Sequence, residues 1–131
     1  MKKIEVVAAV IIKDNKVFCC RRPDGKDLAG YFEFPGGKIE SNETHKEALT
    51  REIKEELNTL INVNKYIMTI DYSYPKFNLI MHIYECSIIE GNLELLEHSE
   101  AVWCDKKDLD KLNFAPADKK IIEYYVGIHN C

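Results

Sequence analysis

The sequence predicts a mixed α/β (α+β) fold in which a curved, mixed β-sheet is sandwiched between helices. Apolar, β-branched runs recur along the chain between turn residues, and such runs are typical of strands. Apolar residues recurring every four positions predict one central helix, and the last part of the chain predicts a second. No repeat, linker or low-complexity segment interrupts this pattern. We therefore expect residues 1–131 to form a single domain with one core.

Strands are expected on both sides of the central helix. Before it, residues 4–12 and 17–22 predict a hairpin closed by the turn at residues 14–16, and residues 31–34 predict a short aromatic strand. The strands expected after it cover residues 61–73, 77–89, 101–104 and, more briefly, 93–96. A short helical turn is expected over residues 105–109.

The last helix is predicted over residues 117–128. Pro116 and Asp118 suit the first turn of a helix, because proline is preorganised for that position and the helix dipole favours an acidic side chain there. Asp118 therefore has a structural explanation that needs no ligand.

The central helix lies in residues 36–59, around which the rest of the chain is organised. Thr44, followed by Glu47 three residues later, is a capping-box signature for its start. The apolar stripe of this helix consists of Leu49, Ile53 and Leu57.

Three carboxylates share one face of this helix. At about 100° per residue, Glu55 lies about 60° to one side of Glu52, and Glu56 lies about 40° to the other. Carboxylates this close raise each other's pKa unless cations neutralise them. A solvated acidic helix face is the alternative. The glycine pair Gly36-Gly37, expected as a turn directly before the helix, favours a hard-cation site for Mg²⁺ or Mn²⁺ with substrate phosphates.

The arginines have two different interpretations. Arg51 lies within helical reach of Glu47 and, two turns back, of Glu43. We expect it to lie off the metal-binding face and to hold the preceding loop onto the helix, with a loose surface pair as the alternative. Arg21 and Arg22 end a strand, so one of them is expected to face inward and to contact phosphate or base, unless both are solvated.

Composition limits the partners and the compartment. A net charge of −4 argues against binding a nucleic acid polymer, and it means that local cations must meet an anionic substrate. Five cysteines without a C-x-x-C motif indicate reduced thiols and a cytoplasmic protein. No signal peptide is expected, and no apolar run has the length of a membrane span.

The central stretch resembles the Nudix box, Gly-X5-Glu-X7-Arg-Glu-apolar-X-Glu-Glu-X-Gly-apolar. The matching residues are Gly37, Glu43, Arg51, Glu52, Ile53, Glu55 and Glu56. Asn58 and Thr59 depart from the glycine and the aliphatic residue of that pattern. Asparagine is the best substitute for glycine in a left-handed helix cap, so we expect a cost in stability but not in chemistry.

The resemblance extends beyond the box to the MutT-type nucleoside triphosphate pyrophosphohydrolases, and within them most closely to the CTP pyrophosphohydrolases. It rests on Glu-Val-Val-Ala-Ala near the start, Arg21-Arg22, residues 32–40, Val102-Trp103-Cys104 and residues 114–118. It implies a Nudix fold and metal-dependent hydrolysis of a nucleoside triphosphate to a monophosphate and pyrophosphate, in nucleotide pool sanitation. Magnesium ions, which manganese can replace, would neutralise the phosphates and acidify the attacking water.

The resemblance also implies roles for individual residues. Glu52, Glu55 and Glu56 would hold the metals, together with the carbonyl of Gly37. Glu97, six residues before Trp103, matches a loop carboxylate that joins the metals or assists the base, although a solvated loop residue is the alternative. Glu52 is the first candidate for the general base and Glu97 the second, while Arg51 completes the catalytic set in a structural capacity.

Three further residues would bind the nucleotide. Arg22 matches a nucleotide contact, Phe34 a residue beside the base pocket, and Asp118 the position that reads the base. A core aromatic is the alternative for Phe34. An ionised Asp118 only accepts hydrogen bonds, which suits the exocyclic amino group of cytosine or adenine, although it could also accept from N1–H and the 2-amino group of guanine. We therefore expect a preference for cytosine nucleotides over 8-oxo-dGTP.

Three alternatives to this expectation remain open. They are an 8-oxo-dGTP diphosphatase of MutT type, a Nudix hydrolase of ADP-ribose or nucleotide sugars, and a nucleotide-binding module without catalysis. The presence of all three box glutamates argues against the last, and the absence of an added segment argues against the second. A monomer or small homo-oligomer is expected.

Overall fold

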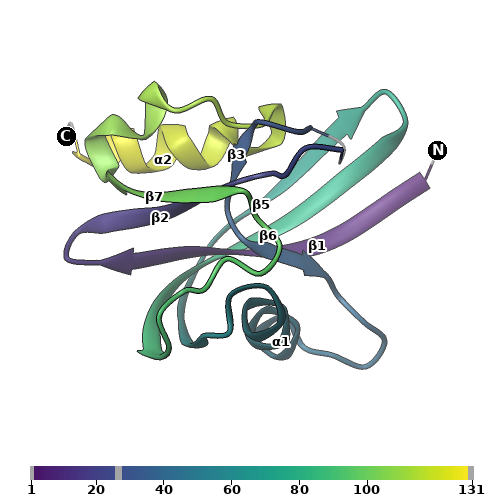
Figure 1. The fold of residues 1–131 in the computed structure, drawn as a ribbon. Helices are drawn as coiled ribbons and strands as arrows, with labels where there is room; N and C mark the ends of the chain where they lie inside the picture. The colour runs from purple at the N-terminus through teal and green to yellow at the C-terminus, as the bar shows by residue number, and fades with distance from the viewer. Residues whose placement is uncertain (1, 26–27, 130–131) are drawn as a thin grey trace.

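The computed structural model describes residues 2–25 and 28–129, and Figure 1 shows their arrangement. Before the central helix, the strands are β1 (Lys2–Lys13), β2 (Lys16–Arg21), β3 (Phe32–Glu33) and β4 (Gly36–Lys38). Helix α1 spans His45–Leu57. It is followed by β5 (Leu60–Tyr74), β6 (Phe77–Glu90), β7 (Glu100–Asp105), 3₁₀ turns at Lys106–Lys111 and Pro116–Asp118, and helix α2 (Lys119–His129).

The strands form one mixed sheet in the order β3-β2-β1-β6-β5, with β4 beside β1 and β7 beside β2. The β1–β6 pair is parallel and runs from Lys2↔Phe77 to Ile11↔Cys86, whereas all other pairs are antiparallel. Helix α1 lies on one side of the sheet and α2 on the other (Figure 1). The predicted sheet between helices is therefore confirmed.

Alternation along β1 builds a core on each face of the sheet. Val7, Ala9 and Ile11 are fully buried in the cluster that includes the apolar stripe of α1. Ala8 and Val10 belong to the other cluster, which includes Ile121, Ile122 and Tyr125 of α2. Successive strand residues point to opposite faces, so β1 is apolar on both sides because both are covered.

Residues at both ends of α1 cap the helix. The capping box of Thr44 and Glu47 is present. Asn58 adopts the left-handed conformation, with φ 48° and ψ 44°, and its backbone N–H donates to Lys54 O. Its Nδ2 also donates to Glu94 Oε1 over 2.9 Å, so asparagine gains a contact here that glycine lacks.

The prediction of a glycine-rich turn directly before the helix is wrong. Gly36–Lys38 forms strand β4, antiparallel to β1 with Gly36 opposite Ala8, and residues 39–44 separate it from α1. A Cβ on Gly36 would lie 2.0 Å from Val7 O. The glycine is therefore required by close backbone packing within the sheet.

The brief strand expected over residues 93–96 is also wrong. No strand forms there, and the backbone N–H groups of Glu94 and Leu96 donate to Leu57 O (2.9 Å) and Glu56 O (3.1 Å). This segment satisfies carbonyls that the end of a helix leaves unpaired. Within residues 2–25 and 28–129, no helix is both long and apolar enough to cross a membrane.

Candidate active site

Arg51 connects the acidic face of α1 to the loop before it. Its Nε and Nη2 donate to the two carboxylate oxygens of Glu43, over 2.7 Å and 2.9 Å, and Nη2 also donates to Lys38 O over 3.0 Å. The predicted role of holding the loop is therefore supported by geometry, but the expected partner Glu47 instead caps the helix. The hydrogen bond from Arg51 holds the pKa of Glu43 at about 2.

The expectation that Arg51 lies off the metal-binding face is wrong. Its Nη1 donates to Glu52 Oε1 over 2.8 Å and reaches Glu55 Oε2 at 3.4 Å. A guanidinium presents several donors in a fixed plane, so one side chain engages the loop and the helix carboxylates together. Arg51 is thus a positioning residue for Glu52.

The three box glutamates differ in environment. Glu55 is exposed, Glu52 is half-buried and Glu56 is only 7% exposed. Burial raises the pKa of Glu56 to about 9, and the hydrogen bond to Glu52 and the charges of Glu52, Glu33 and Glu97 act in the same direction. Glu52 and Glu56, two of the three carboxylates predicted from helical spacing, therefore interact with each other, and the charges of two carboxylates from other elements act on Glu56.

Glu33 and His98 are the site residues that the sequence analysis missed. His98 Nε2 contacts Glu33 Oε2 at 2.9 Å and lies 3.9 Å from Glu56 Oε1. Arg22 Nη1 donates to Glu33 Oε1 over 2.9 Å. Burial opposes ionisation of Glu33, but the hydrogen bonds and charges of His98 and Arg22 outweigh it and lower its pKa.

This network orients Glu33 toward the box carboxylates. The His98 side chain is 4% exposed, and its Nδ1 is buried without a hydrogen-bond partner among the described residues. The run Phe32-Glu33-Phe34 beside the glycines, and His98 directly after Glu97, were the available signals. Neither histidine spacing nor helical periodicity reveals them, because they meet only through β3 and the loop before β7.

Gly37 lies against Glu52. A Cβ added to Gly37 would be 2.2 Å from Glu52 Oε2. Strand β4 thus brings backbone into direct contact with the acidic face of α1, where only glycine fits. This approach is compatible with the carbonyl role that the resemblance implies for Gly37.

Glu97 is exposed in the loop before β7, and its charge contributes to the raised pKa of Glu56. Its role at the metals or the base stays a prediction, and its exposure contrasts with the burial of Glu56.

The residues expected at the nucleotide base are buried to different extents. Arg22 is the more buried of the two neighbouring arginines and faces Glu33, whereas Arg21 pairs with Glu100 at the surface over 2.9 Å. Phe34 is 4% exposed and stacks on Phe114 with ring centroids 5.0 Å apart. The core-aromatic alternative for Phe34 therefore describes the structure, since almost no ring surface is left for a base.

Asp118 departs from the expectation that its carboxyl is ionised. It is 4% exposed within the 3₁₀ turn that precedes α2. Burial raises the pKa of Asp118 well above its usual value, the charge of Glu33 adds to this, and the charge of Arg22 opposes it. A protonated carboxyl both donates and accepts a hydrogen bond, whereas an ionised one only accepts. The raised pKa therefore weakens the acceptor-only argument for cytosine.

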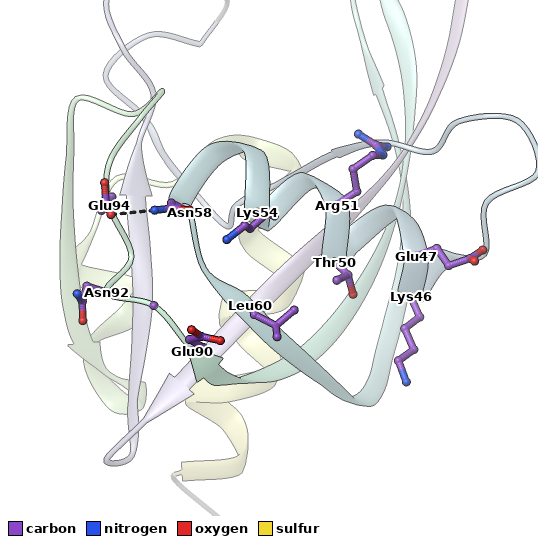
Figure 2. Close-up of a pocket in the computed structure, with 11 residues that line it drawn as sticks. Lys46, Glu47, Thr50, Arg51, Lys54, Asn58, Leu60, Glu90, Asn92 and Glu94 are labelled. Atoms are coloured by element: carbon purple, nitrogen blue, oxygen red, sulfur yellow. Dashed lines mark hydrogen bonds between the residues drawn. The ribbon is translucent and has the colours of Figure 1, made fainter.

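A hollow of about 810 Å³ lies on the other side of α1 (Figure 2). Thr50 and Lys54 line it from the helix, and Leu60 and Glu90 face them from the sheet. Thr50 and Lys54 lie about 160° from Glu52 around the helix axis. The hollow is therefore separate from the converging carboxylates.

The residues at the carboxylate cluster fit a divalent cation. Glu52 and Glu56 present hard oxygen donors beside each other, and the raised pKa of Glu56 reports repulsion from Glu52 and from the nearby charges of Glu33 and Glu97. A divalent ion would relieve this repulsion and return Glu56 to its ionised form. The cation site predicted from the spacing of the helix carboxylates is thus consistent with the tertiary structure.

The contact between Gly37 and Glu52 leads to a prediction about activity. Replacing Gly37 with alanine should displace the Glu52 carboxylate by more than about 1 Å and lower kcat/KM by about 100-fold, because misplaced catalytic groups carry penalties of that size. Steady-state hydrolysis of a nucleoside triphosphate measures the effect. Gly127→Ala is the matched control, since a Cβ there meets nothing within 4 Å. Full activity in Gly37→Ala would contradict the positioning of Glu52.

The raised pKa of Glu56 leads to a prediction about the metal-free protein. The folded state binds a proton at Glu56 between the ordinary pKa of 4.5 and about 9, whereas the unfolded state releases it. The free energy of unfolding should therefore fall as pH rises through this window. Glu56→Gln should remove this dependence on pH. At pH 8 the free energy of unfolding of Glu56→Gln should be higher than that of the wild type by at least ~1.4 kcal/mol, which is the equivalent of one pKa unit.

Urea denaturation in EDTA at several pH values measures this slope. Glu55→Gln is the control, since Glu55 is exposed and its replacement should leave the slope in place. A wild-type stability that is flat from pH 5 to 9 would contradict the buried, protonated Glu56.

Comparisons with known proteins agree with this arrangement. The NUDIX domain family matches residues 6–124. The chain is 35% identical to the CTP pyrophosphohydrolase of Escherichia coli (strain K12), over 98% of this chain and 95% of that protein. It is 32% identical to the 8-oxo-dGTP diphosphatase of Haemophilus influenzae, over 92% of this chain and 90% of that protein.

A solved structure shows the same architecture. The solution structure of the E. coli ORF135 protein superposes with a TM-score of 0.84 at 34% identity, covering 98% of this chain and 92% of that chain. Since the family match spans most of the chain and includes the glutamate-bearing helix, the protein belongs to the Nudix hydrolase family.

Proposed function

We propose that this protein hydrolyses nucleoside triphosphates to a nucleoside monophosphate and pyrophosphate, with Mg²⁺ as its metal and Mn²⁺ able to replace it. The observation that carries this proposal is the position of Glu52, which lies against Gly37 and interacts with the buried Glu56 on the same helix. A polyanionic triphosphate approaches such a site only together with cations, because the protein's own net charge is −4.

The metal is assigned to Glu52, Glu55, Glu56 and the carbonyl of Gly37. A bound divalent ion neutralises phosphate charge and acidifies the attacking water. Arg51 holds Glu52 in place from one side, and Gly37 limits its movement from the other. The proton of the water passes to Glu52 as first candidate for the general base, or to the exposed Glu97 as second. Water adds to phosphorus and the bond between the α- and β-phosphates breaks, which leaves pyrophosphate.

We propose that Asp118 sets the preference for the base. Cytosine presents an acceptor at N3 beside the donor at its exocyclic amino group, and a neutral carboxyl complements both. The CTP pyrophosphohydrolase similarity supports a cytosine nucleotide as the preferred substrate. Asp118 is 4% exposed, so this contact requires a movement of the side chains around it on substrate binding.

A second candidate substrate is 8-oxo-dGTP. Its oxidised guanine presents O6 and N7–H, which a neutral carboxyl complements as well as it does cytosine. The raised pKa of Asp118 thus removes the reason for ranking 8-oxo-dGTP far below CTP, and the similarity to 8-oxo-dGTP diphosphatases points the same way. Both substrates fit a role in maintaining the nucleotide pool.

The remaining assignments follow the sequence. We propose a single Nudix domain over residues 1–131, a monomer or small homo-oligomer, a cytoplasmic location, and no nucleic acid polymer as partner. These assignments rest on composition and charge.

A substrate panel tests the proposed reaction. Purified protein with Mg²⁺ is given CTP, dCTP, 5-methyl-dCTP, dGTP, 8-oxo-dGTP, ATP and ADP-ribose, and pyrophosphate and monophosphate are quantified. We expect pyrophosphate from cytosine nucleotides, and no turnover in EDTA. Turnover of ADP-ribose alone would overturn the substrate class. Nucleotide binding without turnover would favour a binding module.

Substitution of Asp118 tests how the base is read. Asparagine keeps one donor and one acceptor, so Asp118→Asn should preserve the CTP to 8-oxo-dGTP ratio of kcat/KM within about threefold. Leucine keeps neither, so Asp118→Leu should lower kcat/KM for CTP by about 10-fold or more, since a bidentate base contact contributes about 1–3 kcal/mol. A shift of more than tenfold toward 8-oxo-dGTP in Asp118→Asn would instead indicate an ionised, acceptor-only Asp118.

A further inference from the structure

A group of two histidines and one glutamate lies apart from the carboxylate cluster. Glu5 of β1, His45 at the start of α1 and His82 of β6 each present one ligand atom, and these atoms all lie within 4.8 Å of one another. His45 and Glu52 are seven residues apart on the same helix, which places them about 10 Å apart along its axis. The proposed hydrolysis makes no use of this group.

Neighbouring strands and the helix start bring the three residues together. His82 lies opposite Val7 in the parallel β1–β6 pair, and Glu5 lies two residues before Val7, on the same face of β1. His45 follows the helix cap, and its ring stacks on His82 with centroids 4.2 Å apart. Residues from three elements thus meet on the α1 side of the sheet.

Hydroxyl groups already hold the outer nitrogen of each ring. Thr69 Oγ1 lies 2.9 Å from His82 Nδ1, and Tyr84 Oη lies 2.8 Å from His45 Nδ1. Such partners fix the tautomer and orientation of metal-binding histidines. Since a hydroxyl can accept a proton from Nδ1, each ring can carry its proton there, and a bound metal would displace the proton that His82 Nε2 shares with Glu5 Oε2.

The distances are close to those of a bound ion. Zn²⁺ lies about 2.0–2.1 Å from histidine nitrogen and carboxylate oxygen, so tetrahedral ligand atoms are about 3.3 Å apart. His82 Nε2 and Glu5 Oε2 are 2.6 Å apart, and the full set lies within 4.8 Å. A shift of under about 1 Å opens the close pair, and the Glu5 side chain can make it because it is 52% exposed.

The ligand types indicate the class of metal. An ionised carboxylate and a neutral imidazole are the forms in which these side chains bind a metal. Imidazole nitrogen selects borderline transition metals over Mg²⁺, which prefers oxygen.

We propose that Glu5, His45 and His82 form a second metal site for a borderline divalent transition metal of the zinc class. It is independent of the proposed hydrolysis, because it shares no ligand with the carboxylate cluster. A bound ion would connect β1, β6 and the first turn of α1, and so would secure the helix that carries the catalytic glutamates.

Calorimetry tests this site in the full chain. Protein stripped with EDTA and then dialysed into 10 mM Mg²⁺ at pH 7 is titrated with Zn²⁺, so that Mg²⁺ competes at the carboxylates. We expect one Zn²⁺ per chain and a rise in Tm. His45→Gln and His82→Gln should each weaken binding by more than tenfold, and Thr69→Val should weaken it by about tenfold through loss of the hydroxyl that orients His82.

Two controls separate this site from the carboxylate cluster. His98→Gln removes a histidine beside Glu33 and Glu56 and should leave Zn²⁺ affinity unchanged. Histidine nitrogen NMR should show Zn²⁺-dependent shifts at Nε2 of His45 and His82. If His82→Gln fails to fold, the more exposed Glu5→Gln takes its place.

Three results would overturn the proposal. One is the absence of Zn²⁺ binding in the presence of Mg²⁺. Another is unchanged Zn²⁺ affinity in His45→Gln and His82→Gln. The third is loss of Zn²⁺ binding in Glu52→Gln with retention in His82→Gln, which would assign the ion to the carboxylates.

Discussion

The guanidinium of Arg51 is the interaction on which the site depends. It binds both carboxylate oxygens of Glu43, the carbonyl of Lys38 and the carboxylate of Glu52. These contacts join strand β4, the loop that follows it and helix α1, and they add to the direct approach of Gly37 to Glu52. Because a planar guanidinium has donors in several directions, it fixes the catalytic face relative to the glycine strand in a way that an ammonium group would not.

Packing of α1 on the sheet explains why the carboxylates on its acidic face repel one another. The apolar stripe of α1 packs on β1, and this packing brings Glu56 into a buried position beside Glu52, Glu33 and Glu97. Burial and repulsion together keep Glu56 protonated in the metal-free protein. The energy gained by hydrophobic packing thus maintains a cluster that a divalent cation stabilises, which couples metal binding to the stability of the helix.

The two ends of the proposed nucleotide site have different electrostatics. At the phosphate end, carboxylates converge and require cations. At the base end, burial raises the pKa of Asp118, and Phe34 is part of the core against Phe114. Arg22 and Glu33 lie between these ends, since Glu33 contacts His98 on one side and its charge acts on Asp118 on the other. Charge and burial, more than residue identity, therefore distinguish the phosphate end, where hydrolysis is proposed, from the end that would recognise the base.

The caps of α1, the shared face of Glu52, Glu55 and Glu56, and most of the strands follow from periodicities within one segment, so the amino-acid sequence predicts them. Only the folded chain shows that Gly36 lies in a strand, that no strand forms over residues 93–96, that Glu33 and His98 lie beside Glu56, and that burial raises the pKa of Asp118. Each of these depends on which segments lie side by side and on how much water they exclude. Pairing partners and burial are properties of the whole fold, which no local spacing reports.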